Sequence, residues 1–313
     1  MLKFEEISYN YFGKCLKISN DAMEMLVTID LGPRIISYKL KGKENIMCED
    51  IDENSTMEGG AFADVFGDKK WYIYGGHRLW FSPEHNPRSY YPDNDKVEYV
   101  IEGNKVTFTP PAQFENEMQF EMTVEADDLT AEVKVGHRIT NLSEKEIEIS
   151  PWAMTVVDRN SVAILPQCQK DTGLLSNRNI SLWAYTDVYD DRLMIGNRYI
   201  TIKQDSDCKR NLKVGFNNED GWLGMLNKGQ FFVKRFDYLE NAKYPDNHCN
   251  CECFTNFFMM EVESLGELKV LRKDESVSHD EWWNLFECGE SFDRKSEESI
   301  DEFLTKQIMP IQL

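Results

Sequence analysis

The sequence has no apolar run long enough to span a bilayer and no recognisable export signal. No stretch approaches the 18 apolar residues of a membrane helix. The opening residues MLKFEE lack the basic flank and apolar stretch of a signal peptide. We therefore expect a cytoplasmic protein that does not enter a membrane. In a reducing compartment its eight cysteines are expected to be free thiols.

Positive charge is also scarce. The 35 Lys and Arg residues stand against 55 Asp and Glu residues, which gives a formal net charge of −20. A nucleic acid backbone repels such a chain, and so does an anionic membrane surface. We expect neither a nucleic acid nor a membrane as a partner.

The common cofactor and nucleotide motifs are missing. The chain contains no P-loop, dinucleotide fingerprint or HExxH motif, and no GxSxG elbow. Cys249, Cys251 and Cys253 alternate, whereas zinc sites usually space cysteines as CxxC. We expect no cofactor and no metal, and the oligomeric state stays open.

What the sequence does have is a repeated period of two. Apolar residues alternate with polar ones at Met118, Phe120, Met122 and Val124, and again from Ala131 to Ile139. Such alternation predicts half-buried strands of an antiparallel sheet. The stretch Asn141–Lys145 then predicts a turn, which we interpret as a hairpin between the strands on either side.

One helix is expected, near the end of the chain. After Ser296, residues Ile300, Phe303, Leu304 and Ile308 share a helical stripe that stops before Pro310. No linker, repeat or low-complexity stretch divides the chain. The sequence therefore predicts one domain, residues 1–313, that is all-β: a large antiparallel β sandwich with a short C-terminal helix.

Chemically versatile side chains gather in two places. Residues 75–85 (GGHRLWFSPEH) combine His77, Arg78, Trp80 and Glu84, a mixture of rings and charged groups that suits a sugar. A turn with a structural arginine is the alternative. Glu261 and Glu263 are two residues apart in a strand-like run, so they share a face. Burial among Phe and Met residues would raise the pKa of at least one of them, which suits a general base.

Several segments resemble the galactose-mutarotase-like (aldose 1-epimerase-like) superfamily, and within it a bacterial branch with a GGHRLW motif. The resemblance covers roughly residues 20–290. It implies a β supersandwich with a sugar cleft on its concave sheet. The segments that carry it are Gly75–Trp80, His137–Asn141, Ser150–Met154, Gly221–Trp222, Phe232–Phe236, Tyr244–Asp246 and Met260–Ser264.

The resemblance also implies roles for individual residues. Glu263 matches the position of the family's base, while Trp152 occupies the slot of its acidic histidine, so His77 is the substitute acid. The ligand implied is a small carbohydrate, with an anionic sugar as one option because Arg grips carboxylate or phosphate with two bonds. The expected substrate-binding residues are Arg78, Trp80, Glu84, Trp152, Arg235, Asp246 and Glu261.

Two functions in carbohydrate chemistry remain open at this point, beside a purely structural role in an assembly. One is an aldose 1-epimerase-like isomerase that uses acid–base chemistry on an aldose or an anionic sugar. The other is a non-catalytic carbohydrate-binding protein that keeps the cleft and has lost the acid.

Overall fold

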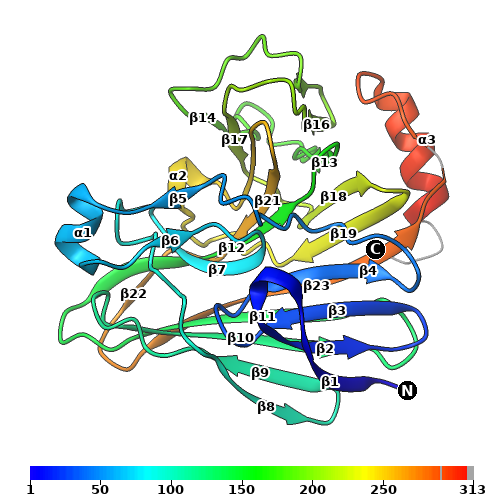
Figure 1. Cartoon of the computed structure of the whole chain (residues 1–313). Coiled ribbons are helices and arrows are strands. Elements are labelled where there is room, and N and C mark those ends of the chain that lie inside the picture. The colour runs from blue at the N-terminus through cyan, green and yellow to red at the C-terminus, as the bar shows by residue number, and fades with distance from the viewer. Residues whose placement is uncertain (290, 309–313) are drawn as a thin grey trace.

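Two large antiparallel sheets pack face to face in the computed structural model, which describes residues 1–289 and 291–308 (Figure 1). The first sheet has the spatial order β1 (Lys3–Ser8), β2 (Lys14–Ser19), β3 (Met23–Thr28), β4 (Ile35–Leu40), β7 (Gly76–Ser82), β12 (Ile147–Val157), β21 (Met260–Leu265), β20 (Cys251–Thr255), β17 (Leu212–Phe216) and β14 (Ile180–Leu182), with β22 (Lys269–Leu271) also paired to β12. The second sheet has the order β15 (Leu193–Ile195), β16 (Tyr199–Lys203), β13 (Val162–Pro166), β18 (Trp222–Asn227), β19 (Gln230–Phe236), β23 (Ser276–Glu287), β11 (Val133–Asn141), β10 (Met118–Ala126), β9 (Lys105–Thr109) and β8 (Glu98–Glu102).

The remaining elements are short. A two-stranded ribbon pairs β5 (Thr56–Met57) with β6 (Trp71–Tyr72). The helices are α1 (Gly60–Phe66), α2 (Pro245–His248) and α3 (Glu297–Ile308), with a 3-10 turn at Asn10–Phe12. Within the described part of the chain, no helix has both the length and the apolar character needed to cross a membrane. The prediction of an all-β sandwich with a C-terminal helix is confirmed.

The alternating patterns behave as expected. Met118, Phe120, Met122 and Val124 are all buried on one side of β10.

In α3, the predicted stripe buries Ile300, Phe303 and Leu304 against the second sheet, where the Phe303 ring meets the Phe231 ring edge-on at 5.0 Å. The side chain of Ile308, and Pro310 beyond it, lie outside the described residues.

The predicted hairpin around Asn141–Lys145 is wrong. The turn exists, because Asn141 Nδ2 donates hydrogen bonds to the carbonyls of Lys145 and Leu271 at 2.8 and 3.0 Å. However, β11 belongs to the second sheet and β12 to the first, and the two strands are not paired. The connection between them therefore crosses from one sheet to the other.

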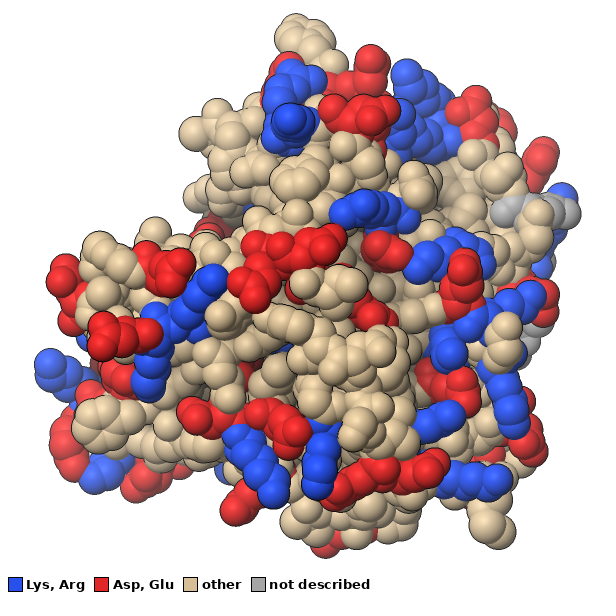
Figure 2. Space-filling view, viewed as in Figure 1, with Lys and Arg blue, Asp and Glu red and all other residues tan. Residues whose placement is uncertain are grey.

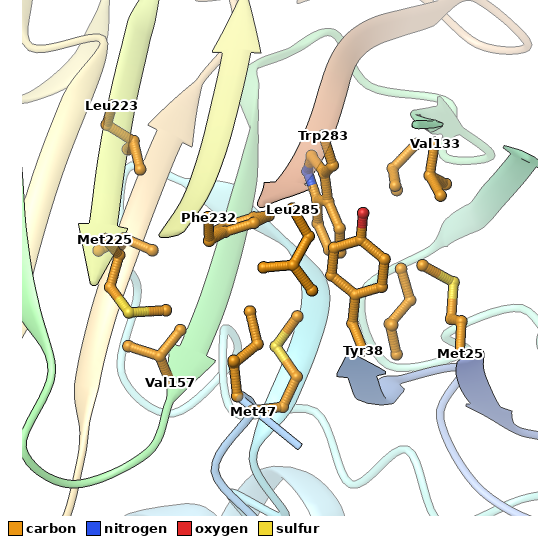
Figure 3. Close-up of a cluster of buried hydrophobic side chains, with 14 of the residues drawn as sticks. Met25, Tyr38, Met47, Val133, Val157, Leu223, Met225, Phe232, Trp283 and Leu285 are labelled. Atoms are coloured by element: carbon orange, nitrogen blue, oxygen red, sulfur yellow. The ribbon is translucent and has the colours of Figure 1, made fainter. Parts of the chain in front are cut away.

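The main apolar core fills the space between the sheets (Figure 3). Tyr38 of the first sheet contacts Trp283 of the second, with ring centres 5.7 Å apart. Phe232 packs edge-on against the same indole at 5.2 Å. Two glycines let β7 enter this packing, since a Cβ on Gly75 would lie 2.1 Å from the Cys48 carbonyl oxygen and one on Gly76 would lie 2.4 Å from that of Ile35. The glycines of the GGHRLW segment are thus required for close backbone approach.

A buried ion pair lies inside this otherwise apolar layer. Lys234 Nζ of β19 is 2.9 Å from Glu281 Oε1 of β23, and neither side chain is exposed. Trp283 Nε1 donates to the other Glu281 oxygen at 2.8 Å, and the Ser264 hydroxyl donates to Oε1. Lys234 also donates to the carbonyl of Val262 in the first sheet at 3.1 Å. The pair therefore joins the two sheets.

Three histidines extend the network, and their hydrogen bonds define their tautomers. His137 Nδ1 faces the carbonyl of His279 at 2.8 Å, so that nitrogen carries the hydrogen. His137 Nε2 must then accept from His77 Nε2, 2.7 Å away, and His77 Nδ1 accepts from the Thr155 hydroxyl at 2.8 Å. Burial lowers the pKa of His77, of His137 and, to about 4, of His279. All three rings are thus neutral in the folded protein at pH 7.

We expect Lys234→Met to destabilise the protein by about 3–5 kcal/mol, because it leaves the Glu281 carboxylate buried without its cation. The matched control is Arg235→Met on the same strand, whose half-buried side chain points the other way. Urea unfolding measures both. Equal free energies of unfolding for the two variants would contradict a structural role for the ion pair.

The three histidines also predict a dependence of stability on pH. The unfolded chain binds protons on them near pH 6.5, whereas burial lowers all three pKa values in the folded chain, so it binds these protons only at lower pH. The free energy of unfolding should therefore fall as the pH drops from about 6.5 toward 4, by up to about 1.4 kcal/mol per pH unit for each histidine. Urea midpoints at pH 5, 6, 7 and 8 measure it, and His85→Gln, at an exposed position, should keep the full slope. A flat profile would show that the histidines are charged inside the fold.

Candidate functional site

A cavity of about 340 Å³ lies on the outer face of the first sheet, opposite the core. Its floor comes from neighbouring strands whose outward residues are in register. Trp80 of β7 pairs with Trp152 of β12, and Met154 pairs with Arg78 on one side and Glu263 of β21 on the other. Paired residues of antiparallel strands point to the same side. We call this cavity the cleft.

Aromatic rings form much of the cleft wall. Trp80 and Trp152 meet edge to face with their centres 5.8 Å apart, and Trp80 meets Tyr90 in the same way at 4.9 Å. The opposite wall holds Trp183 and Tyr185, which follow β14 in the segment at the top of Figure 1. Flat apolar rings of this kind suit the C–H faces of a sugar, and the volume suits a small ligand.

Three glutamates point to the cleft side of the sheet. Glu261 and Glu263 share a face of β21, as predicted, and Glu252 of β20 is paired with Glu263. Glu261 lines the cleft and is 6% exposed, whereas Glu252 and Glu263 are fully buried beneath it. Trp152 Nε1 donates to Glu263 Oε2 at 2.7 Å, so the indole covers that carboxylate.

Two cations balance these carboxylates. Arg78 Nη2 donates to Glu261 Oε1 at 3.0 Å, and its guanidinium carbon lies 4.6 Å from the centre of the Trp80 ring. Lys213 Nζ of β17 is 2.7 Å from Glu252 Oε2 and 3.1 Å from Glu263 Oε2. The same ammonium lies between two indoles, 4.4 Å from the centre of Trp152 and 4.7 Å from that of Trp183.

The burial of this cluster shifts its proton affinities. Burial raises the pKa of Glu261, an effect that Arg78 opposes and the charge of Glu263 reinforces. Burial also raises the pKa of Glu252 well above its ordinary value, although Lys213 opposes the shift. Burial alone would lower the pKa of Lys213, but the charges of Glu252 and Glu263 outweigh it and hold that pKa well above its usual range. The cleft therefore contains a permanent ammonium and carboxyl groups that hold protons more tightly than free ones.

Five of the nine residues expected at the site line the cleft: Arg78, Trp80, Glu84, Trp152 and Glu261. Glu84 is exposed at the rim, where it accepts a hydrogen bond from the Tyr90 hydroxyl at 2.5 Å. Glu263 lies directly below the cleft rather than in its wall. Its role as the base stays a prediction.

The other three expected residues lie elsewhere. His77 precedes Arg78 on β7, so it points to the opposite side, into the network between the sheets, and is not exposed. The expectation that His77 shares a pocket with Arg78 is therefore not met. Arg235 lies on the second sheet, in a separate depression with Gly221 and Trp282. Asp246 lies in α2 outside the cleft lining, and its charge contributes to the raised pKa of Glu252.

His77, His137 and Glu281 also place ligand-type atoms within 4.8 Å of one another. A cation there would have to displace the hydrogen bond between the two imidazoles, which are 2.7 Å apart and have one consistent set of tautomers. The carboxylate is already neutralised by Lys234 at 2.9 Å. The arrangement fits a structural network better than a metal site.

The sequence reasoning missed Lys213 and Glu252. Both could have been found from alternation, because Lys213 stands between the core residues Leu212 and Val214. Glu252 likewise stands between Cys251 and Cys253, which face the core, so it must face the cleft side. A charged residue flanked by core residues on a central strand has only the outer face available.

No family model and no curated protein matches the sequence. Solved structures do match the fold. A galactose mutarotase-like protein from Clostridium acetobutylicum aligns with a TM-score of 0.53 and 14% identity over 92% of this chain and 98% of its own. One from Lactobacillus casei aligns with a TM-score of 0.54 and 9% identity over 87% of this chain and 100% of its own.

A third match is to a longer protein. A TPR-domain containing protein from Parabacteroides distasonis aligns with a TM-score of 0.59 and 13% identity over 90% of this chain, which spans 48% of that protein. Identities this low establish the architecture and nothing finer. The chain has the galactose mutarotase-like fold.

Proposed function

We propose that this protein binds a small carbohydrate in the cleft and catalyses acid–base interconversion of its anomers. The observation that carries the proposal is the pairing of an aromatic wall with a carboxylate that lines the cavity, Glu261. Rings contact the apolar faces of a sugar, while fixed charged groups orient its hydroxyls. The names of the structural neighbours, galactose mutarotase-like proteins, support the same class of ligand.

We assign the base to Glu261, in place of Glu263. Glu261 reaches the cavity, while Glu263 is covered by Trp152 and held by Lys213. Burial raises the pKa of Glu261 toward neutral pH, and a general base is most effective when its pKa lies near the working pH. In this scheme Glu261 takes the proton of the anomeric hydroxyl as the bond between C1 and the ring oxygen breaks. Glu261 then passes this proton to the ring oxygen, which becomes a hydroxyl of the open-chain aldehyde, and reclosure on the other face reverses both transfers.

Lys213 supplies the positive charge in this scheme. Its ammonium lines the cleft, and its high pKa keeps it charged at neutral pH. A fixed charge of this kind stabilises negative charge that develops on the ring oxygen, without giving up its own proton. The scheme therefore needs no histidine in the cleft.

Non-catalytic carbohydrate binding is the second candidate. It is supported by the absence of histidine from the residues described as lining the cleft, and by the tight pairing of both cations with carboxylates. A binding protein needs the aromatic wall and the polar groups but no proton donor.

Two variants of β21, Glu261→Gln and Glu263→Gln, test the assignment of the base. Glu261→Gln should lower turnover by about 10²–10⁴-fold while sugar binding changes little, because the amide still accepts from a hydroxyl. Polarimetry of freshly dissolved aldoses measures turnover, and tryptophan fluorescence measures binding. Glu125→Gln, an exposed position on β10, is the control that should keep full activity.

The outcomes separate the candidates. Loss of turnover in Glu263→Gln but not in Glu261→Gln would return the base to Glu263. Binding without turnover in the unmodified protein would favour the non-catalytic candidate. The proposal fails if no aldose either quenches the fluorescence or is turned over.

A further inference from the structure

The cleft region contains more carboxylates than cations. Glu84, Glu252, Glu261 and Glu263 belong to it, against Arg78 and Lys213. Each cation already has a partner, Arg78 with Glu261 and Lys213 with the two buried glutamates. Acidic side chains also accompany the basic ones over the molecular face shown in Figure 2, in keeping with the net charge of −20.

The charges that a ligand can reach are mainly negative. Arg78 is only 2% exposed, and its unpartnered Nε and Nη1 atoms are themselves buried, so they cannot grip a ligand anion. Lys213 lines the cleft, but the carboxylates of Glu252 and Glu263, 2.7 and 3.1 Å from its ammonium, offset its charge toward a ligand anion. Glu84, by contrast, is exposed at the rim with a single hydrogen bond from a tyrosine.

Glu261 is the deeper of the accessible charges. It is 94% buried yet lines the cavity, and Arg78 binds only its Oε1 atom. Within the described residues, no hydrogen bond is made to Glu261 Oε2. Because Glu261 lines the cavity, this second oxygen is an acceptor left for a ligand.

The aromatic wall has a separate part. The rings of Trp80, Trp152 and Trp183 already have the cations of Arg78 and Lys213 over their faces. The wall therefore supplies apolar surface for the C–H patches of a sugar, while a positive group on the ligand is left to the carboxylates Glu261 and Glu84.

Resting on the proposed function, we propose that the cleft selects amino sugars, with the protonated amine of the ligand bound between Glu261 and the rim carboxylate Glu84. This reverses the option of an anionic sugar that Arg78 suggested in the sequence. The reversal arises because Arg78 is neutralised by Glu261 and screened by Trp80, which the sequence alone does not show.

Binding of an ammonium should also release protons. Burial and the charge of Glu263 raise the pKa of Glu261 despite Arg78. A cation placed beside this carboxyl favours its ionised form and lowers that pKa again. Amino-sugar affinity should therefore increase between pH 5 and pH 7, while the affinity for a neutral sugar changes much less.

The test compares probes that share one ring and differ in charge. Glucosamine, glucose, N-acetylglucosamine and glucuronate form one set, and the corresponding galacto sugars form a second. Isothermal titration at pH 7 and low salt should give at least about tenfold tighter binding of the amine than of the neutral sugar in one set, with the uronate weakest. The preference should shrink in 0.5 M salt, as expected for an electrostatic contribution.

Variants identify the groups responsible. Glu261→Gln and Glu84→Gln should each reduce the amine preference severalfold while neutral-sugar binding persists, and Glu125→Gln should leave the preference intact. Equal or weaker binding of the amine overturns this inference but leaves the proposed function standing. Tightest binding of the uronate also overturns it, in favour of Arg78 as an anion site. If no sugar of either set binds, the proposed function fails together with it.

Discussion

The ion pair between Lys234 and Glu281 determines how the rest of the sandwich is arranged. Two opposite charges inside an apolar layer are tolerated only if each keeps its partners. Here a serine, a tryptophan and a backbone carbonyl from the facing sheet satisfy them. Beside the pair, His77 of β7 is hydrogen-bonded to His137 and Thr155, so its side chain is held on the side of β7 that faces the second sheet. That leaves only one orientation for the next residue on β7, and Arg78 must point outward.

The outward face of the first sheet then collects the charges that the core cannot hold. Each central strand that contributes to the cleft alternates between a core residue and a cleft residue, and Val262 between Glu261 and Glu263 is the clearest case. Two buried polar clusters result, separated by one layer of backbone. The inner one is closed and has its hydrogen bonds satisfied, while the outer one borders a cavity and has unsatisfied oxygens on Glu252 and Glu263. The member of the outer cluster that lines the cavity is Glu261, which Arg78 binds through one oxygen.

Much of this could be predicted from the sequence, and the failures have physical causes. Period-2 alternation predicted the strands and the shared face of Glu261 and Glu263, and the helical period predicted the stripe in α3. It could not show that the turn after Asn141 connects different sheets, because turn chemistry is local and strand pairing is not. The prediction that His77 and Arg78 share one pocket was inconsistent with this alternation, because consecutive residues of a strand point to opposite sides of the sheet. The ion pair that neutralises Arg78 could not be predicted, because its partner, Glu261, lies 183 residues away in the sequence.

Trp152 explains why chemistry in this cleft must differ from an arrangement with a histidine at the same place. Its indole is a donor only, and it donates to Glu263. That single bond has two effects. It covers Glu263, which leaves Glu261 as the carboxylate of β21 that reaches the cavity, and it removes from the cleft the group that would otherwise titrate near neutral pH. Any proton transfer in the cleft then depends on carboxyl groups whose pKa values are raised by burial, with Lys213 as a fixed charge. With a donor-only indole at this position, carboxylates outnumber cations in the cleft region, and this excess is the electrostatic basis of the cationic ligand that we propose.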